Sequence, residues 1–80
     1  MGKEQLLNRI TVNPKVMVGK ATIRGYRISV EQILRALSAG VTEEDLLQDY
    51  PELEHEDIKA VLLYAAELVH DEKIYAVNAA

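Results

Sequence analysis

The sequence has no cysteine and no apolar segment long enough to span a bilayer. Without cysteine, neither a disulfide framework nor a thiolate metal site is available. The longest apolar run, from Ala60 to Ala66, is far shorter than the roughly 20 residues that a membrane helix needs. No basic region precedes an apolar stretch at the start of the chain, so we expect no secretory signal peptide and a cytoplasmic location.

Internal repeats, low-complexity tracts and linkers are also missing, so the 80 residues are predicted to form a single domain. A domain of this size hides only about 60–65% of its unfolded surface, which leaves a thin margin of stability. We divide the chain into a β-arm over residues 1–28, a three-helix unit over residues 29–70 and a tail over residues 71–80.

The charges are unevenly distributed along the chain. Residues 1–40 carry a net charge of +5 and residues 41–80 carry −9, which together give the overall −4. Such an uneven distribution of charge gives information about what the protein associates with, and not about its fold. One interpretation is head-to-tail pairing of charges within one molecule or a homodimer, and the other is a basic face for an acidic partner.

The basic half contains the most informative segment, Gly19–Ser29, which leads directly into a helix. Gly19-Lys20 suits a type II′ turn, and it predicts a hairpin between strands 16–18 and 21–23. A further short strand is expected at 10–12, where Asn13-Pro14 ends it. Gly25 lies between strand-forming residues and predicts a bulge or a sharp bend.

The rest of the chain is predicted to be helical. Ser29 and Gln32 form a capping box for a helix over residues 30–39, which Gly40 ends. Thr42 caps a second, short helix with an acidic first turn, and Pro51 ends that helix.

A third helix is expected over residues 55–70. Its predicted core stripe consists of Ile58, Val61, Leu62, Ala65 and Val69. Leu63, Ala66 and Leu68 widen this stripe, and residues 74–77 resemble a strand that pairs with the N-terminal strands or with another chain. We therefore expect a homodimer, with oligomer contacts at Leu63, Ala66, Leu68, Ile74 and Tyr75.

Three helices, with a short connection between the second and the third, are typical of a helix-turn-helix unit. The third helix would then enter the major groove with its N-terminal residues, but these are mostly acidic and include Lys59 as their only cation. Phosphates are bound by Lys and Arg, so DNA contact would have to come from the arm instead. Its basic residues are Lys15, Lys20, Arg24 and Arg27.

Convergent catalytic groups are missing, so we expect no enzyme, no cofactor and no metal site. His55 and His70 lie near opposite ends of one predicted helix and cannot share a metal within one chain. Gly19-Lys20 has neither the spacing nor the following helix of a phosphate-binding loop. Ser29 is explained better as a helix cap than as a nucleophile.

The order and spacing of several elements resemble the family called domain of unknown function 433. The likeness covers roughly residues 9–66. It is carried by Asn13-Pro14, Gly19-Lys20, Ile23-Arg24-Gly25, Arg27-Ile28, Val30, Leu34, Gly40, Asp49-Tyr50-Pro51, Leu53, Asp57-Ile58, Ala60, Leu62 and Tyr64-Ala65. Glu54 departs from the family's usual capping Thr or Ser, which weakens the start of the third helix.

This resemblance implies a mainly α fold, in which an N-terminal β-hairpin arm precedes a three-helix homeodomain-like bundle with a short C-terminal strand. It also implies an antitoxin that neutralises a PIN-like nuclease, and the alternative is a homodimeric helix-turn-helix regulator that binds DNA. For the antitoxin we expect the partner-binding residues to be Lys20, Arg24, Tyr26 and Arg27.

Arg24 and Arg27 could pair with the carboxylates that hold the nuclease's metals. The other interpretation is that both arginines form salt bridges within the fold, to Glu43, Glu44, Asp45 or Asp49.

Overall fold

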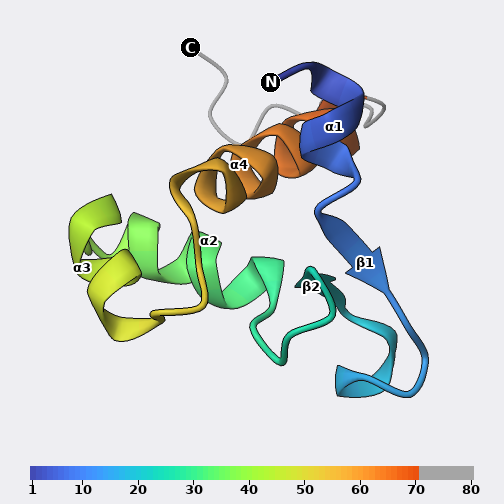
Figure 1. The fold of residues 1–80 in the computed structure, drawn as a ribbon, viewed down its shortest axis with the longest axis horizontal. Coiled ribbons are helices and arrows are strands. Elements are labelled where there is room, and N and C mark those ends of the chain that lie inside the picture. The colour runs from blue at the N-terminus through green and yellow to red at the C-terminus, as the bar shows by residue number, and fades with distance from the viewer. Residues whose placement is uncertain (71–80) are drawn as a thin grey trace, which may run out of the picture.

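The computed structural model describes residues 1–70, which form four α-helices, a 3₁₀ helix and one two-stranded antiparallel sheet (Figure 1). In chain order the elements are α1 (Lys3–Leu7), β1 (Ile10–Val12), η1 (Met17–Gly19), β2 (Ala21–Ile23), α2 (Val30–Ser38), α3 (Glu43–Asp49) and α4 (His55–His70). The predicted order of a hairpin followed by helices is confirmed, but the fold is mixed rather than mainly α, and a further helix, α1, precedes the hairpin. The predicted strand at 74–77 lies outside the described residues.

The hairpin pairs β1 with β2 rather than residues 16–18 with 21–23, so that part of the prediction was wrong. Ile10 lies opposite Ile23, and Val12 lies opposite Ala21. The loop between the strands folds on itself instead of extending, through hydrogen bonds from Val16 N to Asn13 O and from Lys20 N to Met17 O. These local bonds occupy the backbone groups that a strand at 16–18 would have offered to β2.

A second tight turn follows β2 and directs the chain into α2. Arg24 and Gly25 both have positive φ, 45° and 77°, and Tyr26 N donates to Ile23 O at 2.8 Å. Positive φ at both central residues is the signature of a type I′ turn, which glycine adopts without steric cost. The predicted sharp bend at Gly25 is confirmed.

Helices α2 and α3 begin at the predicted caps. Ser29 Oγ accepts a hydrogen bond from Gln32 N at 3.0 Å, and Gln32 Oε1 accepts one from Ser29 N at 3.0 Å. Thr42 Oγ1 accepts from Asp45 N at 3.1 Å. Gly40, directly after α2, has a φ of 93°, a left-handed conformation that suits glycine.

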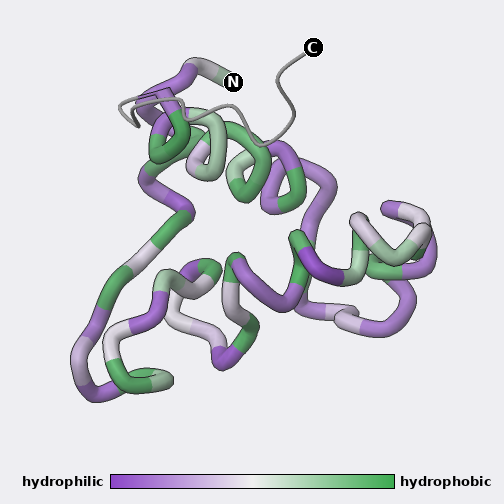
Figure 2. Tube along the Cα trace, turned by 180° about the vertical axis from the view of Figure 1, so that it is seen from behind, coloured by the Kyte–Doolittle hydropathy of each residue, from purple (hydrophilic) through white to green (hydrophobic). Residues whose placement is uncertain are grey.

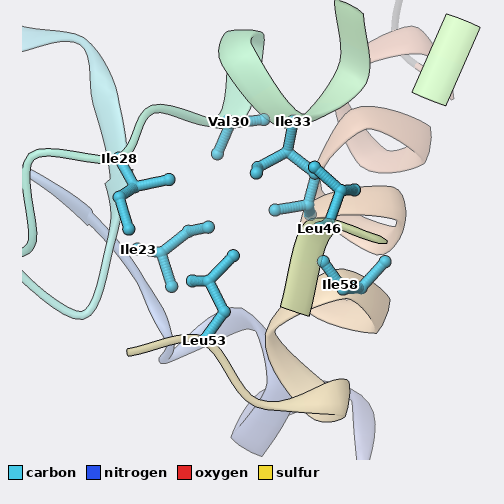
Figure 3. Close-up of a cluster of buried hydrophobic side chains, with 8 residues drawn as sticks. Ile23, Ile28, Val30, Ile33, Leu46, Leu53 and Ile58 are labelled. Atoms are coloured by element: carbon cyan, nitrogen blue, oxygen red, sulfur yellow. The ribbon is translucent and has the colours of Figure 1, made fainter. Parts of the chain in front are cut away.

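A single core joins the hairpin to the helices (Figure 3). Side chains from β2, the turn after it, α2, α3 and α4 converge there. The buried members are Ile23, Ile28, Val30, Ile33, Leu46, Leu53, Ile58 and Val61. Ile58 and Val61, the first two residues of the predicted stripe of the third helix, are therefore in the core, where they hold α4 against α2.

The carboxyl-terminal half of α4 departs from the predicted core stripe. Leu62 and Val69 are 50% and 60% exposed, although both were predicted to be buried. Hydrophobic residues recur along this helix (Figure 2), but α1 covers one side of it, where Lys3 pairs with Glu67. Leu63, one turn before Glu67, is half-buried on that side.

Replacing Ser29 by alanine should lower the free energy of unfolding by about 1 kcal/mol, because Gln32 N would lose its acceptor at the start of α2. Urea unfolding followed by circular dichroism measures this change. Ser38→Ala is the matched control, since Ser38 is exposed at the end of the same helix and should change stability by less than about 0.5 kcal/mol. Equal effects of the two substitutions would contradict the assignment of Ser29 as the cap.

Candidate functional site

The side chain of Asp57, in the first turn of α4, is completely buried between two arginines. Arg24 binds it with two parallel bonds, from Nε to Oδ1 at 3.0 Å and from Nη2 to Oδ2 at 2.8 Å. Arg9 Nη1 donates to Oδ1 at 2.9 Å, and Glu54 N donates to Oδ2 at 2.8 Å. Both carboxylate oxygens therefore accept two hydrogen bonds each. We call Asp57, Arg9 and Arg24 the Asp57 clamp.

The hairpin register brings the two arginines together. Arg9 directly precedes Ile10 and Arg24 directly follows Ile23, and these two isoleucines are paired across the sheet. Arg24 N also donates to Arg9 O at 2.7 Å. Both guanidinium groups thus leave the same end of the hairpin, and the clamp fastens that end to α4.

The clamp has a clear electrostatic effect. Burial raises the pKa of Asp57, but the hydrogen bonds from Arg24, Glu54 N and Arg9 outweigh burial, so the pKa of Asp57 lies below its ordinary value. The pKa of Arg24 is raised, mainly by its hydrogen bonds to Asp57. The carboxylate is ionised and fully paired, which makes the clamp a structural ion pair rather than a proton donor.

Arg24 therefore pairs within the fold, but not with any of the acids that we expected from the sequence. Its partners are Asp57 and, at 3.9 Å, Glu54, and its Nη2 also donates to Glu52 O at 2.6 Å. The expected acids belong to α3 and its surroundings, where Glu43 instead faces His55 at 3.2 Å. Asp57 thus engages Nε and Nη2 of Arg24, whose side chain is 30% exposed.

Two of the other expected basic contacts remain available. The side chains of Arg27 and Lys15 are exposed and form no ion pair or hydrogen bond among residues 1–70. Lys20 is occupied in part, because its Nζ lies 3.1 Å from Glu31 on α2. Tyr26 is 39% exposed and lies against the guanidinium of Arg24, with 5.2 Å between Cζ and the ring centroid.

The arm also exposes hydrophobic side chains. Val18 is 95% exposed and has a left-handed backbone with φ of 56° and ψ of 40°, which is strained for a β-branched residue. Val12 is 61% exposed. We use the name arm surface for the exposed residues Val12, Lys15, Val18, Tyr26 and Arg27. The first three lie at or in the loop that joins β1 to β2, and the other two lie in the turn after β2.

An apolar groove of about 410 Å³ lies between β2, α2 and α4. Its lining residues are Lys20, Ala21, Val30, Glu31, Leu34, Arg35, Tyr64 and Leu68. The three charged side chains form a linked row, since Glu31 binds Lys20 at 3.1 Å and Arg35 at 2.9 Å. Leu68, one of the expected oligomer contacts, is 56% exposed at this groove.

The remaining expected contacts are placed as follows. Ala66 is exposed, Leu63 is half-buried toward α1, and Ile74 and Tyr75 lie outside the described residues. Within residues 1–70, no group of three or more histidines, aspartates or glutamates is arranged to hold a metal ion. None of the helices in the same part of the chain is both long and apolar enough to cross a membrane.

The sequence model of the family described as "Protein of unknown function (DUF433)" matches residues 10–65. The chain belongs to the DUF433 family. The match spans the hairpin, the Asp57 clamp apart from Arg9, and all but the last turn of α4.

Two similar proteins illustrate the likeness. A crystal structure of a DUF433 member protein from Anabaena variabilis ATCC 29413 superposes with a TM-score of 0.75 and 33% identity, over 84% of this chain and 66% of that one. "Uncharacterized protein y4eO" of Sinorhizobium fredii (strain NBRC 101917 / NGR234) is 30% identical over 56 residues, which are 70% of this chain. The match spans 25% of the length of that relative.

The sequence analysis missed the role of Asp57 and Arg9. Asp57 lies among Glu52, Glu54 and Glu56, so the sequence gives it the same appearance as the exposed acids at the start of the third helix. Its position three residues after Glu54 was the available signal, because a carboxylate at that position of a helix accepts from the backbone N–H of the cap.

Asp57→Asn should lower the free energy of unfolding by about 3 kcal/mol, because the neutral amide leaves the two guanidinium groups with only the exposed carboxylate of Glu54 as a counter-charge. Urea unfolding at neutral pH measures the loss. Asp49→Asn is the matched control, because Asp49 is exposed at the end of α3 and should be close to neutral. Wild-type stability of Asp57→Asn would rule out a stabilising clamp.

The lowered pKa of Asp57 also predicts how stability depends on pH. Its contribution is fully present above the unfolded pKa of about 3.9, and it is lost as the pH falls through the lower folded value. The midpoint temperature of thermal unfolding of the wild type should therefore fall steadily below about pH 5. The midpoint of Asp57→Asn should fall less steeply over the same pH range. Glu31→Gln alters an exposed acid whose pKa is also lowered, and its unfolding midpoint should depend on pH nearly as steeply as that of the wild type. If the unfolding midpoint of Asp57→Asn depended on acidic pH as steeply as that of the wild type, the stabilising role of this carboxylate would be contradicted.

Proposed function

We propose that this chain is a non-enzymatic, antitoxin-type protein whose arm surface binds and neutralises a PIN-like nuclease. The observation that carries the proposal is that the Asp57 clamp anchors the arm while Arg27, Lys15 and Val18 remain exposed. An anchored arm loses less conformational freedom on binding, which favours affinity.

The chemistry of the arm surface suits an acidic protein partner. PIN-like nucleases hold metals in a cluster of carboxylates, and the planar guanidinium of Arg27 can bind a carboxylate through two hydrogen bonds. This assigns to Arg27 the role that we first expected for both arginines, since Arg24 is engaged by Asp57. Arg24 then acts as a positioning residue for the turn that carries Tyr26 and Arg27.

Val18 supports a protein partner more than a nucleic acid. Its side chain is 95% exposed, and it occupies a backbone conformation that Asn or Gly adopts with less strain. Neither burial nor backbone preference within the chain explains a valine at this position. Strained backbone and exposed apolar side chains are characteristic of contact sites on proteins.

The alternative is a homodimeric helix-turn-helix regulator that binds DNA through its arms. The exposed side chains of Lys15 and Arg27, which have no partner within residues 1–70, favour it. The amino-terminal end of α4 opposes it, because Glu52 and Glu54 are exposed there and would repel phosphates. Only the arm would then contact DNA.

Isothermal titration of this chain into a PIN-like nuclease encoded beside it tests the proposal. Arg27→Ala and Val18→Asp should each weaken binding by about tenfold or more. The first removes the guanidinium that would bind a carboxylate of the nuclease, and the second adds a negative charge that the acidic nuclease surface would repel. Arg35→Ala is the matched control, since it removes one exposed cation from α2 and should leave the affinity unchanged. Failure of the wild type to bind the nuclease, or wild-type affinity of both arm variants, would refute the proposal. Binding to promoter DNA that weakens steeply between low and moderate salt would instead support the regulator.

Val18→Asn separates function from stability. Asparagine tolerates left-handed backbone better than valine, so this variant should unfold at the same or a higher temperature and gain up to about 1 kcal/mol. Binding to the nuclease should nevertheless weaken, because the apolar contact is lost. A clear loss of stability would show that Val18 is kept for the fold and would remove this support from the proposal.

A further inference from the structure

The carboxyl-terminal half of α4 presents an apolar stripe that no other part of residues 1–70 covers. Leu62 and Val69 are 50% and 60% exposed, and Ala66 between them is exposed as well. Lys59 extends the stripe by one turn, so that the spacing of the four residues is three, four and three. This is the spacing of a helix seam that packs against a second helix. Glu67, which pairs with Lys3 of α1, follows Ala66 by about 100° around the helix, so α1 covers a neighbouring side of α4.

We propose that a second copy of this chain covers this stripe by antiparallel pairing of the two α4 helices. The stripe complements itself in that arrangement. With the two-fold axis beside residue 64, Leu62 packs against Ala66 of the partner subunit, and the symmetric contact repeats on the other side of the axis. A large side chain faces a small one in both central layers, which allows the helices to approach closely.

Charge selects the antiparallel arrangement over the parallel one. Lys59 is exposed and forms no ion pair or hydrogen bond among residues 1–70. In the antiparallel pair its stem lies over Val69 of the partner subunit, and its ammonium group reaches the carboxyl end of that helix. The negative end of a helix dipole attracts a cation, and the acidic residues Asp71 and Glu72 follow in the sequence. A parallel pair would instead place two Lys59 side chains next to each other.

The contact predicts a modest dimer, because only four layers of side chains contribute to it. The arm surface plays no part, so the dimer forms without a nuclease, and its failure is distinguishable from failure of the proposed function. Sedimentation equilibrium of the full chain at about 100 μM should show a dimer that dissociates on dilution.

Leu62→Glu and Val69→Glu should each convert the dimer to a monomer at that concentration while the circular dichroism spectrum stays unchanged, since both positions are exposed. Val12→Glu is the matched control, because it introduces the same charge at a 61% exposed valine of the arm and should leave the dimer intact. A wild-type monomer at about 1 mM would overturn the proposal. A dimer that is unaffected by both α4 substitutions would also overturn it, since another surface would then carry the contact.

Cysteine cross-linking tests the direction of pairing, because the chain has no cysteine of its own. Lys59→Cys and Val69→Cys chains are mixed and oxidised by air with copper phenanthroline. Antiparallel pairing predicts mostly the mixed 59–69 disulfide, since two copies of residue 59 would be roughly 15 Å apart along the helices. A predominance of 59–59 and 69–69 disulfides would indicate a parallel pair and contradict the proposal.

Discussion

The buried carboxylate of Asp57 is the interaction on which the arrangement of this domain depends. A buried charge is costly unless it is paired and hydrogen-bonded, and here two guanidinium groups and one backbone N–H compensate for the burial. Because Arg9 and Arg24 come from opposite strands of the hairpin, one side chain of α4 sets the orientation of both strands. Within the small core, the hairpin contributes the buried Ile23 and the half-buried Ile10 and Ala21.

The clamp also divides the basic residues of the arm into two groups. Arg9 and Arg24 are engaged inside the molecule, whereas Arg27 and Lys15 are exposed and have no partner among the described residues. The basic residues in the first half of the chain therefore include a buried share and an exposed share. Pairing within the molecule accounts for the buried share, and the proposed acidic partner would account for the exposed share.

Helices were predicted from the sequence more successfully than the hairpin, for physical reasons. The starts of α2 and α3 depend on local contacts, in which Ser29 and Thr42 accept from residues three positions ahead. The pairing of β1 with β2 depends on a loop whose left-handed residues, Met17 and Val18, have no sequence signature. The Asp57 clamp joins residues 33 and 48 positions apart, and the only local signal for Asp57 is its position three residues after Glu54, in the midst of exposed glutamates. Likewise, helical spacing alone placed Leu62 and Val69 in the core, since it does not show where a core of this size ends.

The separation of the clamp residues along the chain bears on how the protein is made. Arg9 and Arg24 leave the ribosome well before Asp57 does, so a nascent or prematurely terminated chain contains the basic hairpin without its anchor. In such a chain the two guanidinium groups are solvated and the strands have no core to pack against, because Ile58 and Val61 are also missing. A two-stranded hairpin is at best marginally stable by itself. Only translation through the first turns of α4 produces an ordered arm, which makes the integrity of the carboxyl-terminal half a requirement for the shape of the amino-terminal one.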